Sequence, residues 1–313
     1  VGDADDDCFE APLMFNPPTG TTVPTLQSGD TLNGGGGPAD PLADSMMATF
    51  NYTVPTTVTP TMIGIETINI VDFGTGATTF AGVRTTGLLT INVIASTNPN
   101  ALTFNGLANV VDAGISNSTS GLTLGYAPGA TSAMIDDMSL RLSAVSAGTF
   151  NITSATTNGV EILNIVSDGN AANTLTIIAQ TVGTTMATIN VNGTQALTII
   201  NALPNSVATV NASGSSGGVV VDVSGNISNV TVAGGVGNDT FILGANYTTN
   251  DTVNGGPGTA NTLGLTSATA AAASNQGNVT NIQRLTIIDG LVNPVTVSRF
   301  GSVGTVNLRR GFL

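Results

Sequence analysis

Short segments in which apolar and polar residues alternate recur along most of this chain. They are bounded by Gly, Asn or Ser, and from Thr188 onward they begin roughly 10 residues apart, a spacing typical of a strand with its turn. Because successive side chains of a strand point to opposite faces, the alternation predicts one strand after another. The clearest predicted strands are Leu89–Val93, Leu122–Gly125, Leu175–Ala179, Thr188–Val191, Leu197–Ile200, Ala208–Asn211, Val219–Val223 and Asn229–Val232.

This succession of strands predicts an all-β protein. A β-solenoid, similar to a parallel β-helix, would stack the strands in parallel, with Thr, Asn and Val forming ladders along the stack. Tandem β-sandwich modules would space their strands similarly and are the alternative. The weak period and the Gly- and Asp-rich turns favour the solenoid. Two segments favour a helix instead, Ser132–Val145 and the Ala-rich Ser267–Ser274.

One stretch carries a complete nonapeptide of the form G-G-x-G-x-D-x-U-x, where U is apolar: G-G-V-G-N-D-T-F-I at Gly234–Ile242. Its glycines permit a tight turn with inward-facing carbonyls, and its Asp supplies a carboxylate oxygen. A degraded copy follows at Gly255–Leu263. Oxygen ligands of this kind suit Ca²⁺. The same residues would also be selected by tight turns that need a positive φ, without any ion.

The N-terminal region repeats this arrangement. A turn, a D-T-L-N-G-G or D-T-V-N-G-G segment and a strand occur in the same order near both ends of the sequence, which predicts two related turn-and-strand arrangements. The matching blocks are Asp6–Phe9 with Asn238–Phe241, Asp30–Leu42 with Asp251–Leu263, and Ile65–Ile70 with Ile282–Ile287.

Together these motifs resemble those of bacterial surface-layer and RTX (repeats-in-toxin) adhesin-like proteins. The resemblance implies export, a β-solenoid with RTX-type Gly/Asp turns, a structural Ca²⁺ ion and a structural role at the cell surface. The candidate metal ligands are Gly235, Gly237, Asn238, Asp239, Asp251, Gly256, Gly258 and Asn261 in the C-terminal motif, and Asp7, Asp30, Gly35, Gly37 and Asp40 in the N-terminal copy.

Composition narrows the choice of partners. Hydrophobic residues make up 41 % of the chain but charged residues only 8 %, against about a quarter in ordinary soluble domains. The net charge is −13, which makes nucleic acid a poor partner because phosphates are neutralised by Lys and Arg. Of the 19 acidic residues, 8 lie within residues 1–44, where they suit either a solvated tail or Ca²⁺.

Several kinds of catalysis are excluded. The absence of His rules out a Ser-His-Asp triad and the usual zinc sites, and the absence of Lys rules out a P-loop. The single cysteine, Cys8, rules out an internal disulfide framework. Sugar hydrolysis by paired carboxylates would need aromatic residues to hold the sugar, and these are only 4 % of the chain. We therefore expect no enzyme; a β-helix carbohydrate-active enzyme ranks third among the functions considered.

Three regions are expected along the chain: an irregular, acidic and Pro-rich segment with the first turn motif (1–60), a ladder of strands (61–225), and the RTX-like motif with terminal strands (226–313). No apolar run is long enough to span a membrane. The sequence begins at Val1 with neither Met nor a signal peptide, which indicates a processed start or a piece of a longer polypeptide.

The favoured function is a structural, self-assembling extracellular protein, such as a subunit of a surface layer or filament, with Ca²⁺ stabilising its fold or assembly. Strands with open edges suit such assembly because they present unpaired backbone groups. The expected partners are copies of the same chain and a surface polysaccharide. The alternative is an adhesin fragment or a decoration or fibre protein of a virus particle.

Overall fold

The computed structural model describes residues 7–35, 44–81, 85–156, 158–183, 185–273 and 278–310. Nearly every regular element is a strand, and the strands stack as parallel coils, which confirms the predicted all-β solenoid. Contacts divide the chain into two compact units. Unit 1 comprises Val1–Val160 and Gln180–Thr184, and unit 2 comprises Glu161–Ala179 and Thr185–Leu313.

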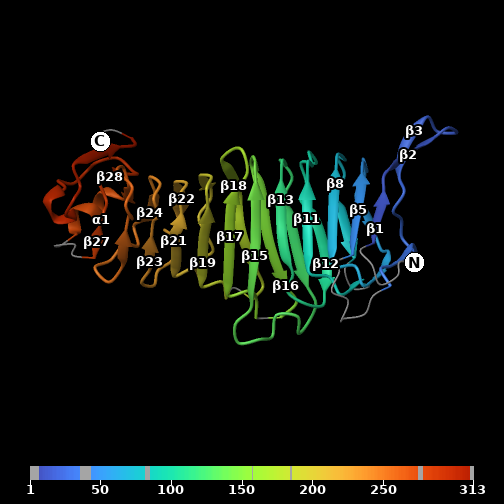
Figure 1. The fold of residues 1–313 in the computed structure, drawn as a ribbon. Helices are drawn as coiled ribbons and strands as arrows, with labels where there is room; N and C mark the ends of the chain where they lie inside the picture. Colours follow the sequence, from blue (N-terminus) through green and yellow to red (C-terminus); the bar gives the residue numbers. More distant parts are fainter. Residues whose placement is uncertain are drawn as a thin grey trace. The chain divides into compact units, whose positions relative to one another are not determined.

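In unit 1, every coil after that of β1 contributes one strand to each of two parallel sheets (Figure 1, blue to green). Sheet I contains β1 (Cys8–Ala11), β5 (Ser45–Phe50), β8 (Thr67–Asp72), β11 (Thr90–Ile94), β13 (Asp112–Ser116) and β15 (Asp137–Ser143). Sheet II contains β6 (Thr56–Val58), β9 (Thr78–Ala81), β12 (Leu102–Leu107), β14 (Leu122–Tyr126) and β16 (Gly148–Ser154). A small third sheet contains β4 (Thr31–Asn33), β7 (Thr61–Ile63) and β10 (Thr85–Thr86), and β2 (Leu13–Asn16) pairs with β3 (Thr21–Pro24) as an antiparallel hairpin.

Unit 2 follows the same plan (Figure 1, yellow to red). Its sheet I contains β17 (Ile162–Asp168), β19 (Thr188–Gly193), β21 (Thr209–Ser215), β23 (Thr231–Ala233), β25 (Thr252–Asn254) and β27 (Val279–Thr280). Its sheet II contains β18 (Asn173–Thr181), β20 (Leu197–Ile199), β22 (Val219–Asp222), β24 (Thr240–Gly244), β26 (Thr262–Leu265), β28 (Arg284–Ile287) and β29 (Thr305–Leu308). Two short helices complete it, α1 (Ser267–Ala272) and the 3₁₀ helix η2 (Val297–Phe300).

The core consists of apolar ladders that run along the stack. In sheet I of unit 1, Met46, Ile68 and Ile91 occupy the same register on three successive coils, and each is 0 % exposed. In sheet II, the rings of Phe80 and Phe104 stack with their centroids 4.8 Å apart. Because burying one such side chain contributes about 1.5–3 kcal/mol, the inward half of the alternating pattern accounts for the stacking of the coils.

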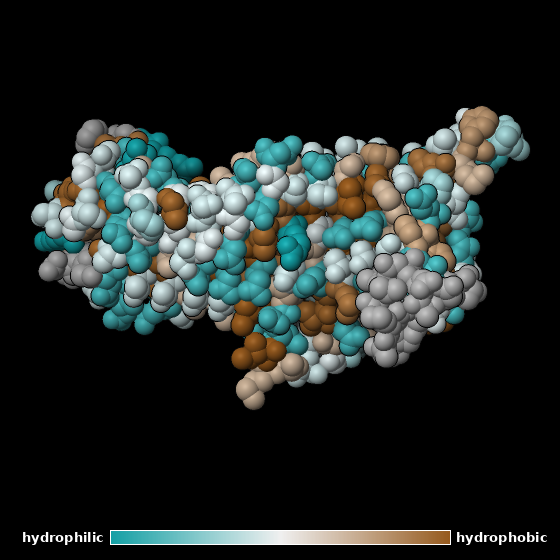
Figure 2. Space-filling view, in the orientation of Figure 1, coloured by the Kyte–Doolittle hydropathy of each residue, from teal (hydrophilic) through white to brown (hydrophobic). Residues whose placement is uncertain are grey.

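Outward positions carry uncharged polar residues, which also form ladders. The Asn92 side chain donates to that of Asn69 at 2.9 Å in unit 1, and Asn190 donates to Asn164 at 2.8 Å in unit 2. On the face shown in Figure 2, apolar residues form separate groups among hydrophilic ones. The outer surface is therefore hydrated mainly through hydroxyls and amides.

One predicted helix is wrong. Half of Ser132–Val145 forms β15, in which Met138, Leu140 and Leu142 are buried and alternate with more exposed neighbours. Period-2 alternation and pairing with β13 therefore outweigh the helix-forming residues of this segment. The other predicted helix is confirmed over Ser267–Ala272, where the Thr266 side chain caps α1 by accepting the Thr269 N–H.

Two further expectations differ from the structure. The described residues of the segment 1–60 contain strands β1 to β6, where we expected irregular structure. Tandem β-sandwiches are excluded because the strands of sheets I and II pair in parallel within each unit. In the described ranges, no helix has the length and apolar character needed to cross a membrane.

Candidate functional site

The C-terminal motif lies in a column of turns in unit 2, which we term the second turn column: Asp239, Asn261 and Gln283. These residues immediately precede the strands β24, β26 and β28 of successive coils. The Asp239 N–H donates to Oδ1 of Asn261 at 2.9 Å, and the Asn261 N–H donates to Oε1 of Gln283 at 2.8 Å. The Asn261 and Gln283 side chains therefore each accept the backbone N–H of the column residue one coil earlier. Without these acceptors, the N–H groups would be buried without a partner.

Both carboxylate oxygens of Asp239 accept backbone N–H groups. Oδ1 accepts from Val219 at 2.7 Å and Oδ2 accepts from Gly235 at 3.0 Å. The residue is 0 % exposed. Burial raises the pKa of Asp239 to about 6, although the two N–H groups act in the opposite direction. Asp239 is therefore already used as a structural acceptor that joins two coils.

The Asn261 amide nitrogen lies among backbone carbonyl oxygens. It donates to the carbonyl oxygens of Asn281 at 3.0 Å, Gly258 at 3.2 Å and Gly256 at 3.3 Å. A group of carbonyl oxygens around one point is the environment that a hard cation requires. In this turn the NH₂ group takes that place, so the turn at Asn261 does not fit a calcium ion.

The neighbouring predicted residues shape the turn. Gly256 has a φ of 72°, and a Cβ at Gly258 would collide with the Gly237 carbonyl oxygen on the preceding coil. Oδ1 of Asn238 accepts the N–H groups of Thr259 at 3.0 Å and Ala260 at 2.9 Å. The glycines are thus required because the turns stack directly on one another, and Asn238 links one turn to the next.

Asp251 does not join this column. It precedes β25, at the opposite turn of the coil, and is 1 % exposed. Its Oδ1 accepts the Val230 N–H at 2.7 Å and its Oδ2 accepts the Thr248 N–H at 2.6 Å. The structure therefore divides the C-terminal candidate ligands between two separate columns of turns.

Unit 1 contains an equivalent column, which we term the first turn column: Asp7, Asp44 and Glu66. The Asp7 N–H donates to Oδ1 of Asp44 at 2.7 Å, and the Asp44 N–H donates to Oε2 of Glu66 at 2.8 Å. This is the bonding of the second column, with Asp44 in the position of Asn261. The sequence alignment had placed Asp40 there, and Asp40 and Gly37 lie outside the described residues.

The turn preceding Asp44 matches its counterpart in unit 2. The Gly35 N–H donates to Oδ1 of Asn33 at 2.9 Å and Gly35 has a φ of 89°, whereas the Gly256 N–H donates to Oδ1 of Asn254 at 3.0 Å. Asp30 lies at the other end of β4 and accepts the Gln27 N–H at 2.8 Å, as Asp251 accepts that of Thr248. Asp30 is therefore separated from Asp44, as Asp251 is from Asn261.

The two columns differ in the group at the centre of the turn. A Cβ at Gly255 would collide with Nδ2 of Asn261 and the Asn281 carbonyl oxygen, and a Cβ at Gly34 would collide with Oδ2 of Asp44 and the Gly64 carbonyl oxygen. A carboxylate oxygen thus replaces the amide nitrogen. Asp44 is 1 % exposed, and no hydrogen bond from the described residues reaches its Oδ2. Two acceptor oxygens therefore lie beside Gly34, where the second column has one acceptor and one donor beside Gly255.

Asp44, Glu66 and Gln283 were missing from the sequence-based set of candidates. Glu66 and Gln283 did align with each other, but only as part of a strand pattern. Asp44 could have been found from its place directly before the alternating run of β5, four positions after Asp40. Among the residues described, no group of three or more Asp, Glu, Cys or His side chains is arranged to hold a metal ion. Any ion at Asp44 would thus depend largely on backbone oxygens.

Comparison of the chain with family models, with curated proteins and with solved structures finds no match. The resemblance to surface-layer and RTX adhesin-like proteins therefore remains a prediction from the motifs, and the function is inferred from the geometry of the site and the fold.

Proposed function

We propose that this chain is a structural protein that assembles with copies of itself outside the cell, at a cell surface, and is not an enzyme. The use of its carboxylates supports this role. Many of these carboxylates accept a backbone N–H from a residue about one coil away in the sequence. Their hydrogen bonds therefore join successive coils. These residues are Asp44, Glu66, Asp112, Asp239, Asp251 and Asp289.

The observation that carries self-assembly is the uncovered end of an apolar ladder in unit 2. Val306 on β29 is in register with Leu285, yet Val306 is 37 % exposed whereas Leu285 is 0 % exposed. Among the described strands, none pairs with the outer edge of β29. An open edge beside an exposed apolar side chain favours the addition of a strand from another chain.

Charge favours a second copy as the source of that strand. The exposed arginines Arg284, Arg309 and Arg310 lie on or next to β28 and β29. Acidic residues are concentrated in residues 1–44 of unit 1. Opposite charges on two different regions of one chain suit a head-to-tail contact between copies, in which the two surfaces are not the same.

Assembly is tested by sedimentation velocity and electron microscopy of the purified chain. Val306→Asp should abolish the assemblies, because it places a charge in the apolar ladder. Asn307→Asp is the matched control, since it adds the same charge at the next position of β29, on its other face. A wild-type chain that stays monomeric at micromolar concentration, or two variants that assemble equally, would overturn the proposal.

We also propose that Ca²⁺ stabilises the first turn column. Asp44 and the Gly64 carbonyl oxygen would hold the ion, which would supply positive charge between oxygens that otherwise repel each other. If these oxygens come together only in the folded chain, the free energy of binding adds to the stability of the fold. Folding would then be favoured where Ca²⁺ is abundant, which is consistent with a place outside the cell.

A further inference from the structure

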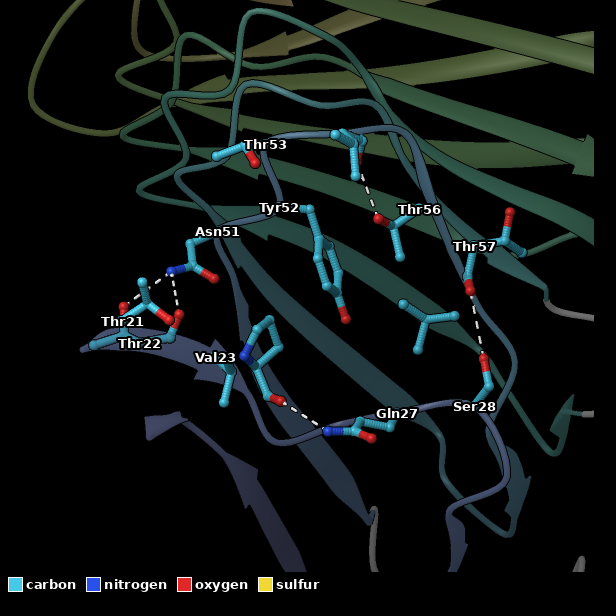
Figure 3. A pocket seen from close by; sticks show the side chains of 13 residues that line it. Thr21, Thr22, Val23, Gln27, Ser28, Asn51, Tyr52, Thr53, Thr56 and Thr57 are labelled. Atoms are coloured by element: carbon cyan, nitrogen blue, oxygen red, sulfur yellow. Dashed lines mark hydrogen bonds between the residues drawn. The ribbon is translucent and has the colours of Figure 1, made fainter. Parts of the chain in front are cut away.

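A cavity of about 870 Å³ lies in unit 1 beside the edge strand β6 (Figure 3). Residues 21–28 form one wall and residues 51–58 form the other. None of the 13 residues that line it is charged, and most carry a hydroxyl or an amide. This volume lies in the range of small-molecule sites in proteins, about 300–1,000 Å³.

Tyr52 is the aromatic residue of this cavity, and its ring points into the space between the two walls (Figure 3). Its ring stacks on that of Phe50 with centroids 5.6 Å apart. Its carbonyl oxygen accepts the N–H groups of Thr75 and Gly76, both at 2.9 Å, from the next coil. The ring is therefore held in place from behind and presents its other face to the cavity.

The two walls are joined by hydrogen bonds at both ends of the cavity. The Asn51 side chain donates to the carbonyl oxygen of Thr22 at 3.1 Å and to its hydroxyl at 3.0 Å. The Ser28 hydroxyl accepts the Thr59 N–H at 3.1 Å and donates to the Thr57 carbonyl oxygen at 3.4 Å. The cavity is thus preformed, so a ligand would not have to pay for ordering its walls.

Polar groups remain unused inside this frame. Among the described residues, no hydrogen bond involves the hydroxyls of Tyr52, Thr53 or Thr57. Burial, and after it the nearby Asp72 carboxylate, raises the pKa of Tyr52, which keeps its hydroxyl protonated and able to donate. An aromatic face surrounded by hydroxyl donors and acceptors suits a ligand with an apolar C–H face and several hydroxyls.

We propose that this cavity binds a neutral saccharide. The uncharged lining offers no partner for a phosphate, sulfate or carboxylate, and the net charge of −13 opposes an anionic ligand. This inference rests on the proposed surface location, because a saccharide site would bind the surface polysaccharide that we expect as a partner. A saccharide site would also favour an adhesin as the second candidate function.

The test uses the full chain with maltotriose, cellotriose and chitotriose as probes, and with sialyllactose as the anionic comparison. Binding is measured by saturation-transfer NMR and by titration calorimetry. At least one neutral trisaccharide should bind. Tyr52→Ala should weaken it at least about tenfold, and Tyr52→Phe, which keeps the stacked ring, about threefold. Thr57→Val should weaken binding without affecting the fold, because Thr57 is exposed.

Thr103→Val is the matched control, because Thr103 is on β12 of the same unit and does not line the cavity. The proposal is overturned if no neutral probe binds at millimolar concentration, or if the cavity variants bind as tightly as this control. It is also overturned if Tyr52→Ala abolishes assembly and leaves saccharide binding intact, since a second copy would then occupy the cavity. Sedimentation of the same variants separates a failure here from a failure of self-assembly.

Discussion

The two turn columns have the same backbone hydrogen bonds but place different groups at the centre of the turn. In the second column, the Asn261 amide nitrogen donates to the carbonyl oxygens of Gly256, Gly258 and Asn281. In the first column, Oδ2 of Asp44 stands at the equivalent place beside the Gly64 carbonyl oxygen and accepts no hydrogen bond from the described residues. Among the described residues, the turn at Asn261 therefore has a donor between its carbonyl oxygens, whereas the turn at Asp44 has an acceptor there.

This difference shows why a nonapeptide match is a weak guide to calcium. The complete motif in unit 2 contains Asp239, whose carboxylate is fully used by the N–H groups of Val219 and Gly235. Asp44 Oδ2, to which no described residue donates, belongs to the less regular copy. The chemistry of a turn is therefore decided by whether a donor or an acceptor faces its carbonyls, and a single atom changes the answer.

The largest effect is expected for Asn261→Asp, which makes the second column resemble the first. A buried carboxylate would then face carbonyl oxygens, at a cost of about 3 kcal/mol or more in the presence of a chelator. Thermal and urea midpoints measure the loss, and added Ca²⁺ should restore part of it. Asn250→Asp, an exposed turn position, is the control and should change neither midpoint. Equal midpoints for both variants would mean that the amide nitrogen of Asn261 does not matter.

A smaller effect concerns the pH dependence contributed by Asp239. Its pKa is raised from 3.8 to about 6 in the folded chain, so the folded state binds more protons than the unfolded state between these values. Stability should therefore fall as pH rises through this window and level off above about pH 6, a change of up to about 3 kcal/mol. Asp239→Asn should remove this fall, and thermal midpoints from about pH 4 to about pH 7 would measure it.

The control for this prediction is Asp222→Asn, the same change at a half-exposed position whose carboxylate accepts the Ser224 N–H. This variant should keep the pH dependence of the wild type. If Asp239→Asn keeps it as well, burial of Asp239 is not its source.

The smallest effect is expected for Glu66→Gln in the first column. Gln283 accepts the Asn261 N–H in the second column as Glu66 accepts the Asp44 N–H in the first. An amide oxygen can therefore replace the carboxylate oxygen as the acceptor. For Glu66→Gln, the free energy of unfolding should change by less than about 0.5 kcal/mol. Glu66→Ala leaves the Asp44 N–H without its acceptor and should lower the free energy of unfolding by about 1 kcal/mol. If Gln proves as harmful as Ala, the charge of Glu66 matters in addition to its hydrogen bond.

The strands could be predicted because inward and outward residues alternate so regularly. Thr188–Val191 lies within β19, and Leu89–Val93 overlaps β11 with a shift of one residue. The same principle explains the failure at Ser132–Val145, where helix-forming residues concealed the alternation of β15. The parallel stacking is the consequence of apolar ladders in register, which a periodic sequence encodes directly.

The candidate site was predicted less well because it depends on loop lengths. The repeat correctly related Asp7 to Asp239 and Asp30 to Asp251, and each pair makes matching hydrogen bonds. A gapless alignment could not show that Asp44, rather than Asp40, stands opposite Asn261. The alignment also could not show that Asp251 and Asn261 lie at opposite turns of one coil, because strand β25 runs between them.

The central claim is that the first turn column, through Asp44, is the part of the molecule that needs a cation. Calorimetric titration of Ca²⁺ into the wild-type chain, Asp44→Asn and Asp239→Asn tests it most directly, with thermal midpoints recorded with Ca²⁺ and with chelator. We expect binding and a Ca²⁺-dependent rise in midpoint in the wild type and in Asp239→Asn, and the loss of both in Asp44→Asn. Binding that survives in Asp44→Asn and disappears in Asp239→Asn, or a wild type indifferent to millimolar Ca²⁺, would contradict the claim.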